Sequence, residues 1–221
     1  MTPGGRHDQI TAMPRKSKPQ AHSHCRIVLT GGPGGGKTTA GDLFRREMDD
    51  QVVLVPEAAT MMFSGGFPRV NLPEAVHAAQ RAIYHVQIHL EEAVKAQHPE
   101  QILLCDRGTV DGAAYWPGGT DGFFEDIGST LEQELSRYDA VIFFESAAVG
   151  HMSIEGGNPI RNESIEQAIK LDRKLRDLWS QHPKFMLVPH NPSFFKKISF
   201  GLAVLDGMVS ELGCQERRKK R

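Results

Sequence analysis

A glycine-rich stretch at residues 31–38 constrains the fold of this chain more than any other feature. It reads GGPGGGKT, which fits the pattern G-x-x-x-x-G-K-[ST], and it lies between an apolar run and a helical segment. Glycines let the backbone come close to a phosphate, so that successive N–H groups can point at the anion, while the helix N-terminus adds partial positive charge. The three glycines of a dinucleotide-binding fingerprint cannot be aligned with this stretch.

The stretch predicts a site for a nucleoside triphosphate with Mg²⁺. Lys37 carries its charge on a flexible stem toward the outer phosphates, and the Thr38 hydroxyl is placed to ligate Mg²⁺. A glycine-rich turn without a ligand is the alternative, but it does not explain a Lys-Thr pair at the start of a helix. The predicted phosphate-binding residues are Gly31, Gly32, Pro33, Gly34, Gly35, Gly36, Lys37, Thr38 and Thr39.

Five short apolar runs alternate with helical patterns along the chain. The runs are almost continuously apolar, which is typical of strands in a parallel sheet that is covered on both faces. We therefore predict a doubly wound α/β fold. The predicted strands are residues 27–30, 52–55, 102–105, 140–144 and 185–188, and the predicted helices are residues 38–48, 73–97, 109–115, 130–136, 163–180 and 192–212.

The longest predicted helix, residues 73–97, carries two stripes. Its apolar stripe, at spacings of three and four, is the predicted core face. Its polar stripe could line an acceptor pocket near the sheet edge or could be a solvated face, and both interpretations stay open. The apolar stripe is Val76, Ala79, Ile83, Val86, Leu90 and Ala93, and the polar one is Gln80, Arg81, Tyr84 and Gln87.

The length of 221 residues fits one domain with basic ends. Residues 1–24 hold almost no large apolar side chains, so we expect a disordered basic segment there, followed by one domain at residues 25–213 and a basic tail at residues 214–221. The part between the ends is acidic, which argues against DNA as a partner. The tail is expected to be solvated, although weak contact with a membrane or phosphoinositides is open to it.

The chain is expected to be cytoplasmic. It has no apolar run of membrane-spanning length and no apolar signal-peptide core. Its cysteines, Cys25, Cys105 and Cys214, are odd in number and far apart, which favours free thiols in a reducing compartment.

Three charged residues follow the second and third predicted strands. Glu57 is a candidate general base for a substrate hydroxyl, with a helix N-cap as the alternative. Asp106 is a candidate Mg²⁺ ligand, partly through water, and Arg107 would bind the substrate or balance Glu57. A buried structural Asp106–Arg107 ion pair is the competing interpretation.

A lid is predicted at about residues 147–180. Its loop reads NPIRNES after a Gly-Gly pair, and closure would bring Arg161 to the transferred phosphoryl group, where negative charge spreads in the transition state. On the following helix, Arg173, Lys174 and Arg176 are expected to form a solvated face, with Asp172 and Asp177 as local partners.

Two further groups bear on ligand binding. The aromatic residues Trp116, Phe123 and Phe124 could stack on a base, although packing is the more common use of such residues. Asn191 follows the last predicted strand and is expected near the base of the nucleotide.

The segments GGPGGGKTT, VPEAAT, CDRGTVDGAAYW and NPIRNES together resemble the AAA_28 group of P-loop proteins over about residues 26–205. That group includes the nicotinamide riboside kinase domain of NadR and the TTD14 proteins. The resemblance implies a P-loop NTPase fold with a five-stranded parallel sheet, helices on both faces and an α-helical lid. The order of parts is also similar to deoxynucleoside kinases, which implies catalytic roles for Glu57, Arg107 and Arg161, with Asp106 serving the metal. Lys37 is a further candidate catalytic residue, on the evidence of the phosphate-binding pattern itself. A single arginine in the lid loop departs from those kinases, which usually carry more.

The sequence thus predicts a kinase that uses ATP, with GTP possible, and Mg²⁺ to phosphorylate a small nucleoside-like molecule. The TTD14 resemblance implies a different class, a GTP-binding or ATP-binding regulatory protein that contacts phosphoinositides or a protein partner. A simple NTP hydrolase needs only water in place of the acceptor hydroxyl, so the same residues also allow it.

Overall fold

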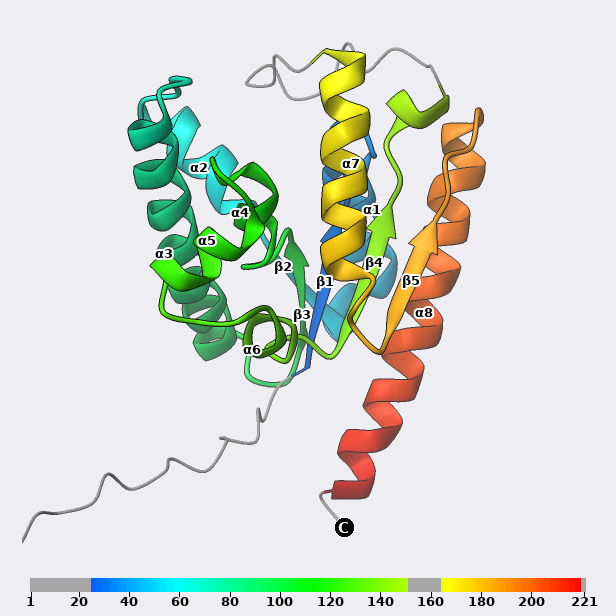
Figure 1. The fold of residues 1–221 in the computed structure, drawn as a ribbon. Coiled ribbons are helices and arrows are strands. Elements are labelled where there is room, and N and C mark those ends of the chain that lie inside the picture. The colour runs from blue at the N-terminus through cyan, green and yellow to red at the C-terminus, as the bar shows by residue number, and fades with distance from the viewer. Residues whose placement is uncertain (1–24, 151–163, 220–221) are drawn as a thin grey trace, which may run out of the picture.

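Five parallel strands form the centre of the computed structural model, which describes residues 25–150 and 164–219. The sheet order is β2-β3-β1-β4-β5 (Figure 1). The strands are β1 (Arg26–Thr30), β2 (Val52–Val55), β3 (Ile102–Asp106), β4 (Ala140–Phe144) and β5 (Phe185–Val188). This all-parallel sheet, with helices around it, confirms the predicted P-loop NTPase type of α/β fold, and each predicted strand agrees with the structure to within one residue.

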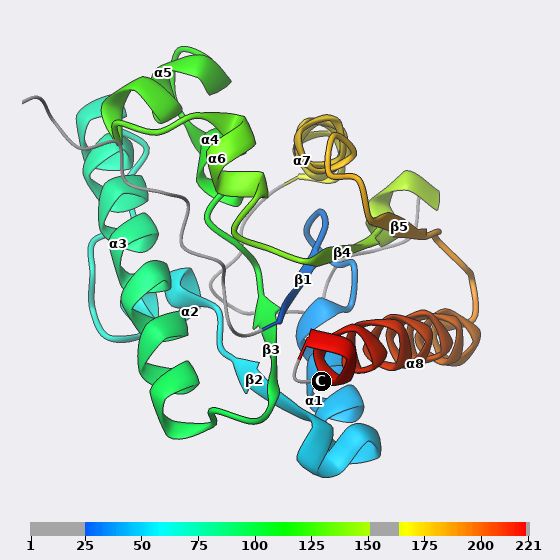
Figure 2. The same cartoon turned by 90° about the horizontal axis from the view of Figure 1, so that it is seen from below.

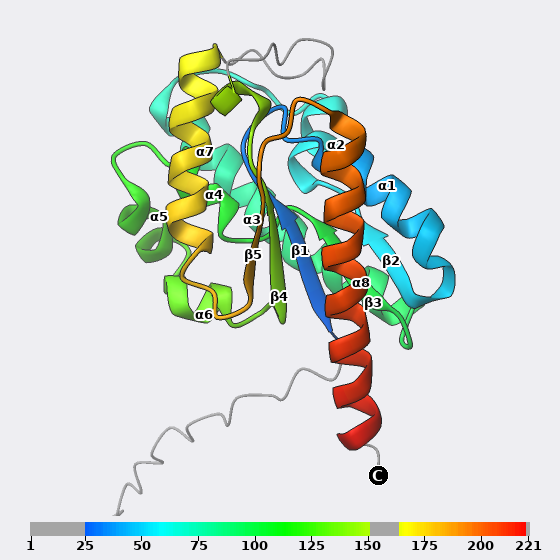
Figure 3. The same cartoon turned by 90° about the vertical axis from the view of Figure 1, so that its right-hand side faces the viewer.

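Helices cover both faces of the sheet. Helices α1 and α8 lie on one face, and α4, α6 and α7 lie on the other (Figures 2 and 3). The helices are α1 (Lys37–Met48), α2 (Ala58–Ser64), α3 (Pro73–Gln97), α4 (Asp111–Tyr115), α5 (Thr120–Asp126), α6 (Leu131–Leu135), α7 (Ile165–Trp179) and α8 (Phe194–Lys219), with short 3₁₀ turns η1 (Asp49–Gln51) and η2 (Ala147–Gly150).

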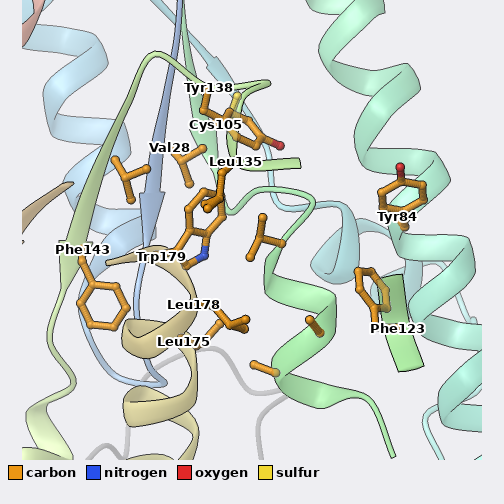
Figure 4. Packing of buried hydrophobic residues seen from close by; sticks show 14 of the residues in the cluster. Val28, Tyr84, Cys105, Phe123, Leu135, Tyr138, Phe143, Leu175, Leu178 and Trp179 are labelled. Atoms are coloured by element: carbon orange, nitrogen blue, oxygen red, sulfur yellow. The ribbon is translucent and has the colours of Figure 1, made fainter. Parts of the chain in front are cut away.

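Each face of the sheet has its own apolar core. On the α1 and α8 face, Phe44 and Leu205 are fully buried against the strands. On the other face, Trp179 lies at the centre of a cluster with Phe143, Leu175 and Tyr138 (Figure 4). Burying side chains of this size is the main favourable contribution to folding, at about 1.5–3 kcal/mol for each one. The two cores therefore hold the strand ends in fixed relative positions.

The register of the strands decides which loops meet. Leu29 of β1 pairs with Asp106 of β3, and Val55 of β2 pairs with Cys105 of β3. The residues that follow β1, β2 and β3 therefore emerge together at the carboxyl edge of the sheet. In open α/β sheets this edge is where ligands bind.

The structure corrects several details of the predicted helices. Helices α2 and α5 were not predicted, and α8 continues to Lys219 instead of ending near residue 212, so most of the expected tail extends this helix. The apolar stripe of α3 was only partly right as its core face: Ala79 is buried and Leu90 packs against the core, but Ile83 is only half-buried and Ala93 is exposed. Its most buried residues are Ala79, Gln80, Tyr84, Gln87 and Glu91.

The physical reason is that α3 meets the rest of the protein through buried polar contacts as well as through apolar side chains such as Ile88 and Leu90. Glu91 accepts hydrogen bonds from Gln87 and Tyr138, and Tyr84 donates one to Glu134. Buried polar side chains are tolerated when they are bonded in this way.

No helix in the described residues is long and apolar enough to cross a membrane.

Candidate active site

The glycine-rich loop connects β1 directly to α1 and curls tightly against the end of β4. Gly31, Gly34 and Gly36 all have positive φ angles, of 137°, 70° and 85°. A Cβ on Gly31 would lie 2.0 Å from the carbonyl oxygen of Phe144, so only glycine fits there. Gly36 takes the N-cap position of α1. No side chain caps the helix there, so the first N–H groups of α1 are not occupied by a capping side chain.

The Lys37 side chain folds back over the loop. It is 3% exposed, and its Nζ donates hydrogen bonds of 2.9 Å to the carbonyl oxygens of Gly31 and Gly32. Ala40 is the first residue of α1 whose N–H donates back along the helix, at 2.9 Å to Gly36. The ammonium group and the tip of the helix thus lie on one compact loop, which is the arrangement that binds a polyphosphate.

Asp172 of α7 supports this loop from behind. One carboxylate oxygen, Oδ1, accepts hydrogen bonds from the N–H groups of Gly32 at 2.9 Å and Ser146 at 2.8 Å. Burial raises the pKa of Asp172, and these two N–H groups oppose that shift. The hydroxyl of Ser146 also donates to the carbonyl of Pro33. The beginning of the loop is therefore tied to the end of β4 and to α7.

The expectation that Asp172 pairs locally on a solvated face was wrong. Arg173, Lys174 and Arg176 are indeed exposed, but Asp172 is 2% exposed and points into the protein. A signal was present in the sequence, because Asp172 continues the buried stripe of Ala168, Leu175 and Trp179 at helical spacing.

Thr38 and Asp106 bring the loop and β3 together. The Thr38 hydroxyl donates a hydrogen bond of 2.8 Å to Asp106 Oδ2. Asp106 is buried, and its Oδ1 has no hydrogen-bond partner among the described residues. Burial, followed by the negative charge of Glu57, raises the pKa of Asp106. A hydroxyl beside a carboxylate with an unused buried oxygen fits a Mg²⁺ ion, which would neutralise the phosphates and polarise the transferred group.

Arg107 lies between two carboxylates. Its Nε donates to Glu57 Oε1 at 2.5 Å, and its Nη1 donates to Asp111 Oδ1 at 2.6 Å. A buried ion pair therefore does form at this point, but its acids are Glu57 and Asp111. Arg107 also has a φ of 72°, an uncommon conformation for a residue with a Cβ, and such strain is concentrated at functional sites.

Asp111 is the residue of this group that the sequence analysis missed. It accepts hydrogen bonds from Thr30, from the indole of Trp179 at 3.0 Å and from Arg107. Arg107 has a φ of 72° and lies before α4, which begins at Asp111, so the helical spacing rule for ion pairs does not apply to this pair and offered no signal for it.

Glu57 opens α2 but does not cap it. Its carboxylate makes no cap hydrogen bond to the helix backbone, and it accepts one of 2.5 Å from the Thr60 hydroxyl. Glu57 is 8% exposed. Two donors, Thr60 and Arg107, thus hold a buried carboxylate at the edge of the sheet, which contradicts the N-cap alternative.

A cavity of about 290 Å³ lies beside Glu57 and Arg107. Of the polar stripe on α3, Gln80, Tyr84 and Gln87 line the cavity, which favours the first of the two predicted alternatives for them. Arg81 is exposed and pairs with Asp126 at 2.6 Å. The aromatic and charged lining comprises Phe63, Tyr84, Tyr115, Phe123, Glu57, Arg69, Arg107 and Asp111.

The aromatic residues after α4 mainly pack. Trp116 is 7% exposed and stacks on His77 with ring centroids 4.2 Å apart, and Phe124 contacts Phe123 edge-on. Phe123 alone of the three expected residues also borders the cavity. Arg161 and the rest of residues 151–163 lie outside the described residues, so the predicted lid loop does too.

Residues 26–192 match the family model AAA_28, an AAA domain. The chain belongs to this family. No curated protein gives a significant match to the chain. The AAA_28 match spans all five strands and the loop described above, and it identifies a nucleotide-binding P-loop protein.

Proposed function

We propose that this AAA_28 protein is a kinase that transfers the γ-phosphoryl group of a nucleoside triphosphate, ATP or alternatively GTP, to a hydroxyl of a small nucleoside-like molecule. The cavity beside Glu57 and Arg107 carries this proposal. A hydrolase needs room only for water, whereas this cavity has the size and mixed polar and aromatic lining of a site for an organic molecule.

The strand register supports a donor site and an acceptor site that lie next to each other. Asp106 and Arg107 are consecutive, and Asp106 touches Thr38 while Arg107 touches Glu57. The terminal phosphate of a nucleotide on the loop would therefore lie on the Thr38 side, and the acceptor would lie on the Glu57 side. Holding two reactants in this relation lowers the barrier by saving the entropy of their encounter.

The chemical step follows from these positions. The acceptor hydroxyl gives its proton to the Glu57 carboxylate, its oxygen forms a bond to the γ-phosphorus, and the bond from that phosphorus to the β,γ-bridging oxygen breaks. The nucleoside diphosphate leaves with the bridging oxygen. Lys37 and, in this proposal, Arg161 of the lid would stabilise the charge that spreads over the transferred group. Mg²⁺ at Thr38 and Asp106 would supply further charge neutralisation.

Arg107 has a double role in this scheme. Its Nε holds the Glu57 carboxylate in place, while its buried Nη2 has no hydrogen-bond partner among the described residues. A buried donor without a partner costs about 1–3 kcal/mol. An acceptor oxygen in the adjoining cavity would satisfy that donor, which supports a substrate with several hydroxyl or carbonyl groups.

The test is a phosphoryl-transfer assay. The protein is incubated with Mg²⁺, γ-labelled ATP or GTP, and a panel of nucleosides, nicotinamide riboside and vitamins, and labelled products are separated. We expect one acceptor to become labelled, and the Lys37→Ala variant to bind no triphosphate and label nothing. Release of free phosphate alone would contradict the kinase and favour a hydrolase.

A regulatory protein would give a different result. It would retain GTP tightly without forming a product, and it would bind phosphoinositide vesicles in a way that is lost when residues 217–221 are removed. The same assay, with vesicle sedimentation added, therefore separates the kinase from the regulator that the TTD14 resemblance implies.

A further inference from the structure

Helix α8 contacts the phosphate loop through Lys197 and Phe194. The Lys197 Nζ donates hydrogen bonds to the carbonyl oxygens of Gly35 at 2.9 Å and Glu145 at 2.5 Å, and Lys197 is 4% exposed. Phe194 lies so close to Gly36 that a Cβ there would be 2.7 Å from Phe194 Cε2. The two residues are three positions apart and hence on the same side of the helix. The first turn of α8 is thereby fixed against the loop.

Phe194 nevertheless leaves much of its ring in solvent. Its exposed fraction is 50%, although the edge of the ring contacts the loop. An apolar ring of this size is normally buried, and exposing it forgoes part of the free energy that burial supplies. A half-exposed aromatic ring, held rigidly beside an anion-binding loop, is suited to receive a flat group from a ligand that occupies the loop.

We propose that the Phe194 ring is the surface on which the base of the bound nucleoside triphosphate stacks. This inference rests on the nucleotide binding at residues 31–39 described above. The base is covalently joined to the phosphates through the ribose, so it lies close to the loop, and Phe194 borders the loop at Gly36. The AAA_28 match ends at residue 192, two residues before Phe194, so it gives no role to Phe194.

The structure also shows why Asn191 is less suited to this role. The Asn191 Oδ1 accepts a hydrogen bond of 2.9 Å from the N–H of Ser193 and so shapes the turn that leads into α8. Asn191 therefore helps to place Phe194, while the stacking surface is the ring itself. Stacking is tolerant of base identity because every base has a π face, so ATP and GTP are both expected to use it.

The test compares ligands with and without a base on the full chain. Isothermal titration is carried out with Mg·ATP, Mg·GTP and Mg·tripolyphosphate on the wild type and on Phe194→Ala, Phe194→Leu, Phe194→Trp and Phe195→Ala. We expect Phe194→Ala and Phe194→Leu to weaken ATP and GTP binding by about 5- to 150-fold, with tripolyphosphate unaffected. Phe194→Trp should retain nucleotide binding. The neighbouring Phe195 side chain is 78% exposed, so Phe195→Ala should behave as the wild type.

Three outcomes would overturn the inference. Equal loss of ATP and tripolyphosphate binding in Phe194→Ala would mean that the ring only supports the loop. Unchanged ATP binding would mean that the base lies elsewhere. A dimer of the wild type that Phe194→Ala dissociates, with ATP binding unchanged, would mean that a second copy covers the ring. Because these readouts are binding constants, a failure of phosphoryl transfer would contradict the kinase and leave the stacking result intact.

Discussion

The hydroxyl of Thr38 donates a 2.8 Å hydrogen bond to Asp106 Oδ2 and so joins the first turn of α1 to the end of β3. These two residues are 68 positions apart in the chain, and parallel pairing of β1 with β3 brings them together. A hydroxyl and a carboxylate on separate elements make a site that forms only in the folded protein. Its preference for a hard cation can therefore be tested by changing one ligand at a time.

Asp106→Asn tests the proposed metal ligand. The amide keeps an oxygen that can accept from Thr38 but removes the charge, so we expect Mg²⁺ to improve ATP binding about tenfold less than in the wild type. Titration of ATP with Mg²⁺ and with EDTA gives the two constants. In EDTA the variant should bind ATP at least as well as the wild type, because a nearby negative charge is gone. An unchanged effect of Mg²⁺ would remove Asp106 from the metal site.

Glu57→Gln tests the proposed base. Glutamine has nearly the same shape and can still accept from Arg107, but it cannot take a proton from a hydroxyl. We expect nucleotide binding to be unchanged and kcat to fall by about 10²- to 10⁴-fold. Thr60→Ala is the matched control, because it removes the second donor to Glu57 without touching the carboxylate. Equal turnover in Glu57→Gln and the wild type would exclude Glu57 from proton transfer.

Asp172→Ala tests the support of the phosphate loop. Removal of the carboxylate leaves the buried N–H groups of Gly32 and Ser146 without their acceptor, at a cost of about 2–4 kcal/mol in the free energy of unfolding. Asp172→Asn keeps an acceptor oxygen and should recover most of this stability and of the ATP affinity. Denaturant titration and ATP titration measure the two effects. Similar losses in both variants would show that charge, not the shared acceptor, matters here.

The lowered pKa of Lys197 predicts that the free energy of unfolding depends on pH. Burial lowers the pKa of Lys197 from 10.5 to about 8, with the charges of Asp172 and Glu145 opposing the shift. Between about pH 8 and pH 10.5, Lys197 is protonated in the unfolded chain and neutral in the folded protein. The unfolded state therefore binds more protons, and this residue makes the free energy of unfolding rise with pH over that interval. Compared with Lys197→Met, the wild type should gain about 1–3 kcal/mol from pH 7.5 to pH 10. Denaturation of both proteins at the two pH values gives the difference, and a constant difference would contradict the lowered pKa.

The local patterns of the chain were enough to predict the sheet and the phosphate loop. Strands buried on both faces need nearly continuous apolar runs, and glycines that allow positive φ must be adjacent in sequence to form such a loop. Both signals are contained in a few consecutive residues. The positions of Glu57, Asp106 and Arg107 at one edge also followed, because strand ends in a parallel sheet share that edge.

Only the tertiary structure decided which side chains meet across the sheet. The hydrogen bond from the Trp179 indole to Asp111, the burial of Asp172 behind Gly32 and the contact of Phe194 with Gly36 depend on how elements from distant parts of the chain pack. The polar face of α3 shows the same limit, because its glutamines are buried by partners that periodicity does not reveal. Sequence periodicity reports how each element divides apolar from polar residues, whereas the identity of the partner depends on three-dimensional packing.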